Sequence, residues 1–130
     1  MCGIAGTSDG NWAFLESTRI GLKHRGPDYD AIWRDENTGF GLSHTRLSVI
    51  DLSNAASQPM ESACGRWILS YNGEVYNFRE LRAELEAMGE TFRSSGDTEV
   101  VLAVLRRDGT AGLARFAGMF AIALWDRPER

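Results

Sequence analysis

Cysteine at position 2 is the residue with the most specific chemistry in this sequence. Removal of Met1 would leave Cys2 at the N-terminus, where one residue carries both a thiol and a free α-amine. A thiol needs a base to become a thiolate, and an α-amine titrates near neutral pH, with a pKa of about 8. Such a residue can supply its own general base, as N-terminal nucleophiles do. A lone cysteine is also often an ordinary buried apolar residue, so both interpretations stay open here.

Three further positions offer polar chemistry, and each also has a purely structural interpretation. Arg46 lies beside the apolar stretch 47–52, where an arginine either extends along the surface or clamps a carboxylate with two hydrogen bonds. Asn72-Gly73 follows an apolar run, which predicts a turn or a pair of oxyanion donors at a strand end. Asp97 precedes an apolar helical segment, where N-capping is the simpler explanation.

The spacing of apolar residues predicts the elements that must position these side chains. We expect helices at 11–23, 77–88 and 98–107, a helical turn at 111–116, and strands at 31–34, 40–42, 67–71 and 119–125. The three helices have Asn11, Asn77 and Asp97 as candidate N-caps. The stretch 119–125 is apolar throughout, which predicts a strand at the centre of a sheet.

Residues 24–28 interrupt the first helical pattern with a Gly-Pro pair. Proline fixes its own backbone and cannot continue a helix. The segment is therefore either a surface turn or a rigid loop that presents His24, Arg25 and Asp28 near a site.

Composition limits the classes of function. The 130 residues predict one domain, and a net charge of −4 without a basic run does not indicate a nucleic-acid or membrane surface. No apolar run approaches the length of a membrane span, and the N-terminus lacks the pattern of a secretory signal. Cys2 and Cys64 do not form a disulfide framework, so we expect a reduced, cytoplasmic setting. No cysteine or histidine pair has metal-ligand spacing, and no metal site is expected.

Several motifs in order along the chain resemble one family. The chain resembles the N-terminal glutaminase domain of glutamine-hydrolysing asparagine synthetases, which are class II glutamine amidotransferases of the Ntn-hydrolase superfamily. The matching segments are MCGIAG (1–6), HRGPD (24–28), RLSVID (46–51), QPM (58–60), YNGEVYN (71–77), GDTE (96–99) and GMFAIALWD (118–126). The RLSVID segment is more typical of asparagine synthetases than of the other class II enzymes.

This resemblance implies catalytic roles for three residues. Cys2 would be the nucleophile that attacks the side-chain amide of L-glutamine, with its α-amine as base and then as acid for the leaving ammonia. Asn72 and Gly73 would donate hydrogen bonds to the oxyanion.

The resemblance also implies a binding site for the two charged ends of glutamine. Arg46 would bind the α-carboxylate, Asp97 would pair with the α-ammonium, and Glu74 would help to bind the amine end. The pocket would further include Leu47, Ser48, Val49 and Ile50, as well as Asn72 and Gly73.

The implied fold is α+β, with two antiparallel β-sheets packed face to face and flanked by helices in the αββα sandwich of Ntn hydrolases. The family's glutaminase domain continues beyond the position of Arg130, so we expect residues 1–130 to be a partial, C-terminally incomplete domain. ATP and Mg are expected only in a synthetase domain outside these residues, and no cofactor is expected here.

The expected partners are L-glutamine and a synthetase domain or another amide acceptor, with a homodimer in the parent protein and no nucleic acid or membrane. The expected function is release of ammonia for ATP-dependent amidation of aspartate. The alternative is an inert fragment, or a glutamine-binding module that keeps the fold without turnover.

Overall fold

The computed structural model describes residues 1–127 and contains six strands and three α-helices in that range. The strands are β1 (Gly3–Thr7), β2 (Tyr29–Asp35), β3 (Phe40–Arg46), β4 (Met60–Glu61), β5 (Trp67–Val75) and β6 (Gly118–Asp126). The α-helices are α1 (Trp12–Gly21), α2 (Phe78–Ala87) and α3 (Thr98–Asp108). Short 3₁₀ helices cover Lys23–Arg25, Asn54–Ala56 and Gly109–Arg115.

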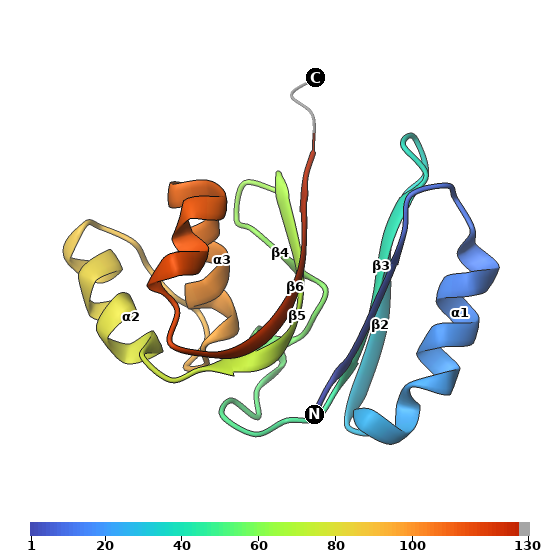
Figure 1. The fold of residues 1–130 in the computed structure, drawn as a ribbon, viewed down its shortest axis with the longest axis horizontal. Coiled ribbons are helices and arrows are strands. Elements are labelled where there is room, and N and C mark those ends of the chain that lie inside the picture. Colours follow the sequence, from blue (N-terminus) through green and yellow to red (C-terminus); the bar gives the residue numbers. More distant parts are fainter. Residues whose placement is uncertain (128–130) are drawn as a thin grey trace.

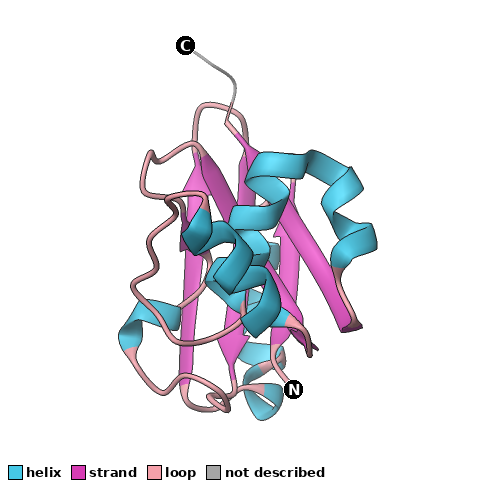
Figure 2. Ribbon diagram, turned by 90° about the vertical axis from the view of Figure 1, so that its left-hand side faces the viewer, coloured by secondary structure: helices cyan, strands magenta, loops and turns pink. Residues whose placement is uncertain are grey.

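The strands form two antiparallel sheets, ordered β1-β3-β2 and β4-β5-β6. The sheets lie face to face, with α1 outside the first and α2 and α3 outside the second (Figure 1). Figure 2 shows α2 and α3 lying in front of the strands that they cover. The α+β sandwich implied by the resemblance is therefore confirmed.

Strand β3 connects the layers because its alternate residues face opposite sides. Thr45 Oγ1 donates a hydrogen bond of 3.1 Å to the carbonyl of Leu22, at the end of α1. His44 faces the other sheet, where its Nε2 lies 3.1 Å from the carbonyl oxygen of Tyr71 in β5. Arg46 follows two residues after His44, so the strand directs its side chain towards the second sheet as well.

The main apolar core lies between β5 and the helices α2 and α3. Its buried members are Met60, Leu69, Tyr71, Val75, Phe78, Leu81, Leu85 and residues 100–105. All six residues from 100 to 105 are at most 6% exposed, which confirms that the apolar segment predicted at 98–107 is a buried helix. The loop before α3 carries Asp97 and is therefore attached to a helix that is packed into the core.

The first two helices begin where they were predicted, but only the first has the predicted side-chain cap. Asn11 Oδ1 accepts the N–H of Phe14 at 3.0 Å and so caps α1. The Asn77 side chain makes no cap hydrogen bond to α2. It donates to the carbonyl of Arg115 and accepts the N–H of Ala117, each at 2.9 Å. The capping prediction for Asn77 is wrong because a distant backbone segment competes for its amide.

The turn predicted at Asn72-Gly73 is absent, because β5 continues through both residues to Val75. Gly73 pairs with Phe120 of β6 in an antiparallel register. A Cβ added at Gly73 would lie 2.3 Å from the carbonyl oxygen of Met119. Glycine is needed here because a neighbouring strand approaches closely.

Strand β6 lies at the edge of its sheet in residues 1–127, and the prediction of a central strand is wrong for this part of the chain. It pairs with β5 along its whole length. Met119 is 71% exposed and Phe120 is 36% exposed. The apolar residues at the start of β6 are therefore on the surface or next to the cavity described below.

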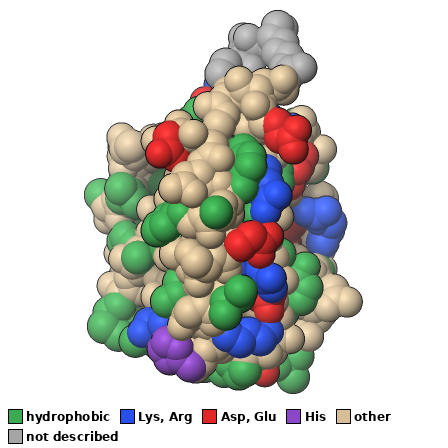
Figure 3. Space-filling model, turned by 90° about the vertical axis from the view of Figure 1, so that its right-hand side faces the viewer, with side chains coloured by type: hydrophobic (Ala, Val, Ile, Leu, Met, Phe, Trp, Pro, Cys, Tyr) green, Lys and Arg blue, Asp and Glu red, His purple; other side chains and the backbone are tan. Residues whose placement is uncertain are grey.

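The outer face that carries α1 has a mixed charge. Figure 3 shows acidic and basic side chains interleaved on this face. Arg19 bridges Glu16 and Asp30, Lys23 also pairs with Asp30, and Arg34 pairs with Glu16 at 2.8 Å. Within the described residues, no helix is both long and apolar enough to cross a membrane.

Candidate active site

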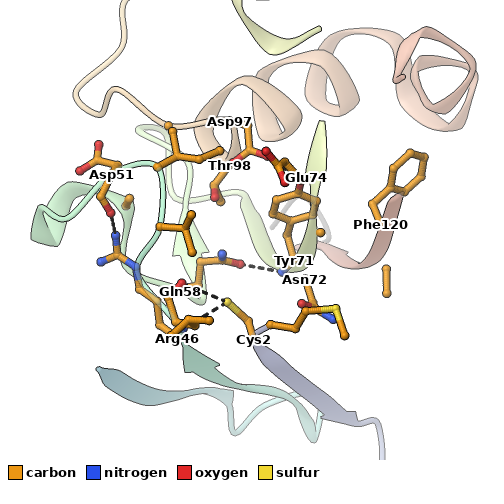
Figure 4. Close-up of a pocket in the computed structure, with 18 of the residues that line it drawn as sticks. Cys2, Arg46, Asp51, Gln58, Tyr71, Asn72, Glu74, Asp97, Thr98 and Phe120 are labelled. Carbon is orange, nitrogen blue, oxygen red and sulfur yellow. Dashed lines mark hydrogen bonds between the residues drawn. The ribbon is translucent and has the colours of Figure 1, made fainter. Parts of the chain in front are cut away.

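A cavity of about 380 Å³ opens where the two sheets, the loop after β3 and the start of α3 meet. Its size falls in the range of small-molecule sites, roughly 300–1,000 Å³. Figure 4 shows Cys2 and Arg46 on one side and Asp97 and Glu74 on the opposite side. The cavity also has apolar walls, contributed by Leu47, Val49, Ile50, Met119 and Phe120 among others.

All but one of the site residues predicted from the sequence line this cavity. Those present are Cys2, Arg46, Leu47, Val49, Ile50, Asn72, Gly73, Glu74 and Asp97. Ser48 is not among the lining residues. Its backbone N–H donates a hydrogen bond of 2.7 Å to Asp28 Oδ2, so Ser48 ties the loop after β3 to the segment before β2.

Cys2 is half-buried directly before β1, and its thiol lies against the backbone of Leu47. The Leu47 N–H donates to Cys2 Sγ at 3.4 Å, and Sγ lies 3.7 Å from the Leu47 carbonyl oxygen. Arg25 Nε donates to the carbonyl of Cys2 at 3.2 Å. These contacts hold the sulfur at the cavity wall. Met1 also lines the cavity and is 74% exposed.

The loop 24–28 supports this arrangement by packing closely on β3. A Cβ added at Gly26 would lie 2.3 Å from the backbone carbon of Thr45. Arg25 and Asp28 then reach the residues beside the cavity, as the rigid-loop hypothesis expected. His24 does not, because it is exposed and its Nδ1 lies 2.9 Å from the carbonyl oxygen of Gly21.

Arg46 is only 6% exposed, and its guanidinium organises the loop that follows it. Nη1 donates to the carbonyl of Ser53 at 2.8 Å, and Nη2 donates to the carbonyl of Asp51. A guanidinium has five N–H donors, so these two bonds leave others for a ligand. The position is buried and directed at the cavity, which excludes the interpretation of Arg46 as a solvated surface residue.

Asp97 is 6% exposed, and its side chain does not cap α3. Its Oδ2 accepts the Tyr71 hydroxyl at 2.7 Å and the Val75 N–H at 3.0 Å. Burial and the hydrogen bond to Asp97 raise the pKa of Tyr71 far above its usual range, which keeps the hydroxyl protonated as a donor. The capping interpretation of Asp97 is therefore wrong, and the carboxylate is anchored to β5 beside the cavity.

Sequence reasoning did not assign site roles to Gln58, Asp51 or Tyr71, which also line the cavity. Gln58 is 5% exposed, and its Oε1 accepts the Tyr71 N–H at 2.6 Å. All three residues belong to motifs that carried the family resemblance, and their place in those motifs was the available signal. The Tyr71 contact joins segments far apart in sequence, so spacing could not predict it.

The described residues hold no cluster of three or more histidine, cysteine, aspartate or glutamate side chains arranged to bind a metal ion. Cys64 is exposed and lies outside the cavity, with its Sγ 3.4 Å from Ser62 Oγ. The chemistry available at the cavity is therefore that of a thiol, a guanidinium, carboxylates and amide groups.

Two face-to-face antiparallel sheets enclosed by helices define an Ntn-hydrolase type of fold. The same fold occurs in the glutamine PRPP amidotransferase from B. subtilis, with a TM-score of 0.71 and 21% sequence identity over 96% of this chain and 34% of that one. A sequence model of the glutamine amidotransferase domain matches residues 1–130, and the chain belongs to this enzyme family.

Curated relatives at higher identity are asparagine synthetases. Asparagine synthetase [glutamine-hydrolyzing] 1 of Bacillus subtilis is 38% identical over 99% of this chain and 21% of its own length. Asparagine synthetase B [glutamine-hydrolyzing] of Escherichia coli is 40% identical over 86% of this chain and 19% of its own length. The chain thus spans about one-fifth of the length of these relatives.

Proposed function

We propose that this domain hydrolyses the side-chain amide of L-glutamine to glutamate and ammonia, with Cys2 as the nucleophile. The observation that best supports the proposal is the convergence on one cavity of polar residues from separate segments. Cys2 comes from the N-terminus, Arg46 from the end of β3, Asn72 from β5 and Asp97 from the start of α3. Each is a residue type that the reaction needs.

Substrate recognition follows from the two charged groups on opposite sides of the cavity. The Arg46 guanidinium binds the α-carboxylate of free glutamine, because its planar fork suits a carboxylate. Asp97 pairs with the α-ammonium through Oδ1, which has no hydrogen bond to any described residue. Glu74 adds a second negative charge at the same side. Glutamine within a peptide lacks both charges and is rejected.

The chemistry begins after removal of Met1, when the α-amine of Cys2 takes the proton of the thiol. The thiolate sulfur bonds to the amide carbon of glutamine, while Asn72 and Gly73 donate hydrogen bonds to the oxyanion. The α-ammonium then gives its proton to the amide nitrogen, and the C–N bond breaks to release ammonia and leave a thioester on Cys2. Water cleaves the thioester, which releases glutamate and restores the thiol.

We further propose that the ammonia serves ATP-dependent amidation of aspartate by a synthetase domain outside these residues. The support is the names of the relatives at 38% and 40% identity, both glutamine-hydrolysing asparagine synthetases. ATP and Mg would then belong to that other domain.

The test is a time course of glutamate and ammonia release from L-glutamine by protein whose loss of Met1 is verified by mass spectrometry. We expect turnover by this protein and none by Cys2→Ala or by a form with a retained N-terminal tag, in which the α-amine is an amide. Cys64→Ser is the matched control, because Cys64 is exposed and outside the cavity. Equal turnover by tagged and untagged protein would refute the mechanism. Glutamine binding without turnover in the untagged protein would instead support a binding module.

A further inference from the structure

We propose that Asp51 is a positioning residue that sets the distance between Arg46 and Asp97, the two charged groups that bind glutamine. This inference rests on the proposed function, and it concerns a residue without an assigned role in catalysis or binding. Asp51 is 8% exposed and lines the cavity between the loop after β3 and the loop before α3.

The Asp51 carboxylate joins these two loops with both of its oxygens. Oδ1 accepts the N–H of Ser53 at 2.7 Å, within its own loop. Oδ2 accepts the N–H of Ser95 at 2.6 Å and the hydroxyl of Ser95 at 3.1 Å, across 44 residues of sequence. Hydrogen bonds from Ser53 and Ser95 hold the pKa of Asp51 well below its usual range, so the side chain stays an acceptor at neutral pH.

Each loop also adjoins one of the charged groups proposed to bind glutamine, Arg46 at the end of β3 and Asp97 at the start of α3. Arg46 Nη2 donates to the backbone carbonyl of Asp51 itself (Figure 4). Ser95 is two residues before Asp97, and a Cβ added at Gly96 between them would lie 3.3 Å from Asp51 Cβ. A continuous chain of contacts therefore runs from Arg46 through Asp51 to the backbone that places Asp97.

A fixed separation matters because glutamine must satisfy both charged groups at once. When two contacts are held at the correct spacing, the ligand binds both without a cost for ordering the site. If the spacing is variable, the second charged group must be ordered during binding, and the second contact then adds less to the affinity for glutamine. Ligands that have only one of the two charged groups do not depend on the spacing.

The variant that tests this is Asp51→Asn, which keeps the shape of the side chain. An asparagine has one acceptor oxygen and one NH₂ donor, so it must turn the NH₂ towards the N–H of either Ser53 or Ser95. One link is then lost, and two donors face each other. Glu99→Gln is the matched control, because Glu99 Oε2 accepts hydrogen bonds of 2.9 and 2.7 Å from Ser94 in the same loop, whereas the Asp51 carboxylate accepts from Ser53 and Ser95.

Binding is measured by calorimetry in a Cys2→Ala background with Met1 removed, so that no turnover occurs. The three ligands are L-glutamine, glutaramate, which lacks the α-amine, and 4-aminobutanamide, which lacks the α-carboxylate. We expect Asp51→Asn to weaken glutamine binding by roughly tenfold or more. We expect the dissociation constants of the two one-ended ligands to change by less than about threefold. Glu99→Gln should leave unchanged the ratio between the affinity for glutamine and the affinities for the two ligands that have only one charged group.

An equal loss for all three ligands, no loss for glutamine, or the same ratio change in Glu99→Gln would each overturn the positioning role. Absence of glutamine binding when Asp51 is intact would refute the proposed function itself and the inference with it. Ser95→Ala provides a milder variant if Asp51→Asn fails to fold, because it removes only the hydroxyl contact of 3.1 Å. It should change the same ratio in the same direction, and an unchanged ratio would overturn the inference.

Discussion

The Tyr71 hydroxyl donates a hydrogen bond of 2.7 Å to Oδ2 of Asp97. This bond holds the Asp97 carboxylate beside the cavity, where it does not cap α3. The Val75 N–H donates to the same oxygen at 3.0 Å. Two donors on one oxygen fix the direction of the carboxylate and leave Oδ1 without a bond to the described residues. The start of α3 therefore has a charged group at the cavity and lacks a side-chain cap.

Asp97→Asn separates ligand binding from fold stability. The amide oxygen of the substituted side chain can still accept the hydroxyl of Tyr71 and the N–H of Val75, so we expect the melting temperature to change little. The negative charge at the amine side is lost, and KM for glutamine should rise by roughly tenfold or more. Melting temperature and steady-state kinetics on this one variant check both statements. A normal KM would show that Asp97 does not bind the ammonium.

Arg46→Ala should affect both the site and the loop after β3. Loss of one partner of a desolvated pair costs roughly 2–5 kcal/mol, which corresponds to a fall in kcat/KM of about one and a half to three and a half decades. The group lies away from the breaking bond, so the change should appear mainly in KM. The melting temperature should also fall, because the guanidinium donates to the carbonyls of Ser53 and Asp51.

Arg46→Lys separates the loss of the positive charge at the site from the loss of the hydrogen bonds that the guanidinium makes. It keeps the positive charge but cannot bond two loop carbonyls and a carboxylate together. We expect KM to rise less than in Arg46→Ala while kcat stays similar. A large fall in kcat in either variant would contradict a role confined to binding the α-carboxylate.

His44 makes stability depend on pH in a defined window. Burial lowers the pKa of His44 from 6.5 to about 4, nearby Arg46 contributes to the lowering, and the hydrogen bond to the Tyr71 carbonyl partly opposes the shift. Between these two pH values the unfolded chain binds a proton that the folded chain does not. The free energy of unfolding should therefore decrease as pH falls through this window, by roughly 3 kcal/mol at most.

Urea unfolding at a series of pH values from about 7.5 to 4 measures this slope. His44→Gln removes the titrating group, and its slope should be smaller than that of the unsubstituted protein. His24→Asn replaces the exposed histidine and should leave the slope unchanged. An undiminished slope in His44→Gln would assign the effect to other groups.

Gly73→Ala tests the close approach of β6 to β5. The added Cβ would lie 2.3 Å from Met119 O and 2.6 Å from Phe120 Cα, which are backbone atoms that cannot rotate away. We expect a loss of roughly 1–3 kcal/mol in unfolding free energy as β6 shifts. Gly21→Ala is the control, because nothing lies within 4 Å of its added Cβ. Equal melting temperatures for the two variants would show that β6 accommodates the methyl group.

Much of the local structure was predictable from the chain alone. Asn11 caps α1 as expected, and residues 98–107 form a buried helix because their apolar residues surround the axis. These features depend on residues a few positions apart, whose spacing is visible in the sequence. The candidate chemistry of Cys2 is local in the same sense, because it depends only on the position next to Met1.

Tertiary contacts decided the rest, since the partners lie far apart in the chain. Asp97 and Asn77 both stand where a cap is expected. The Asp97 side chain instead accepts a hydrogen bond from Tyr71, and the Asn77 side chain bonds to the backbone of residues 115 and 117. Asn72-Gly73 has the composition of a turn, but pairing with β6 extends β5 through it. Asp51 gains its linking role only when Ser95 is brought against it. A hydrogen bond or strand pair formed in the fold outweighs a weak local preference. The spacing of residues in the sequence does not show which distant residue will become the partner.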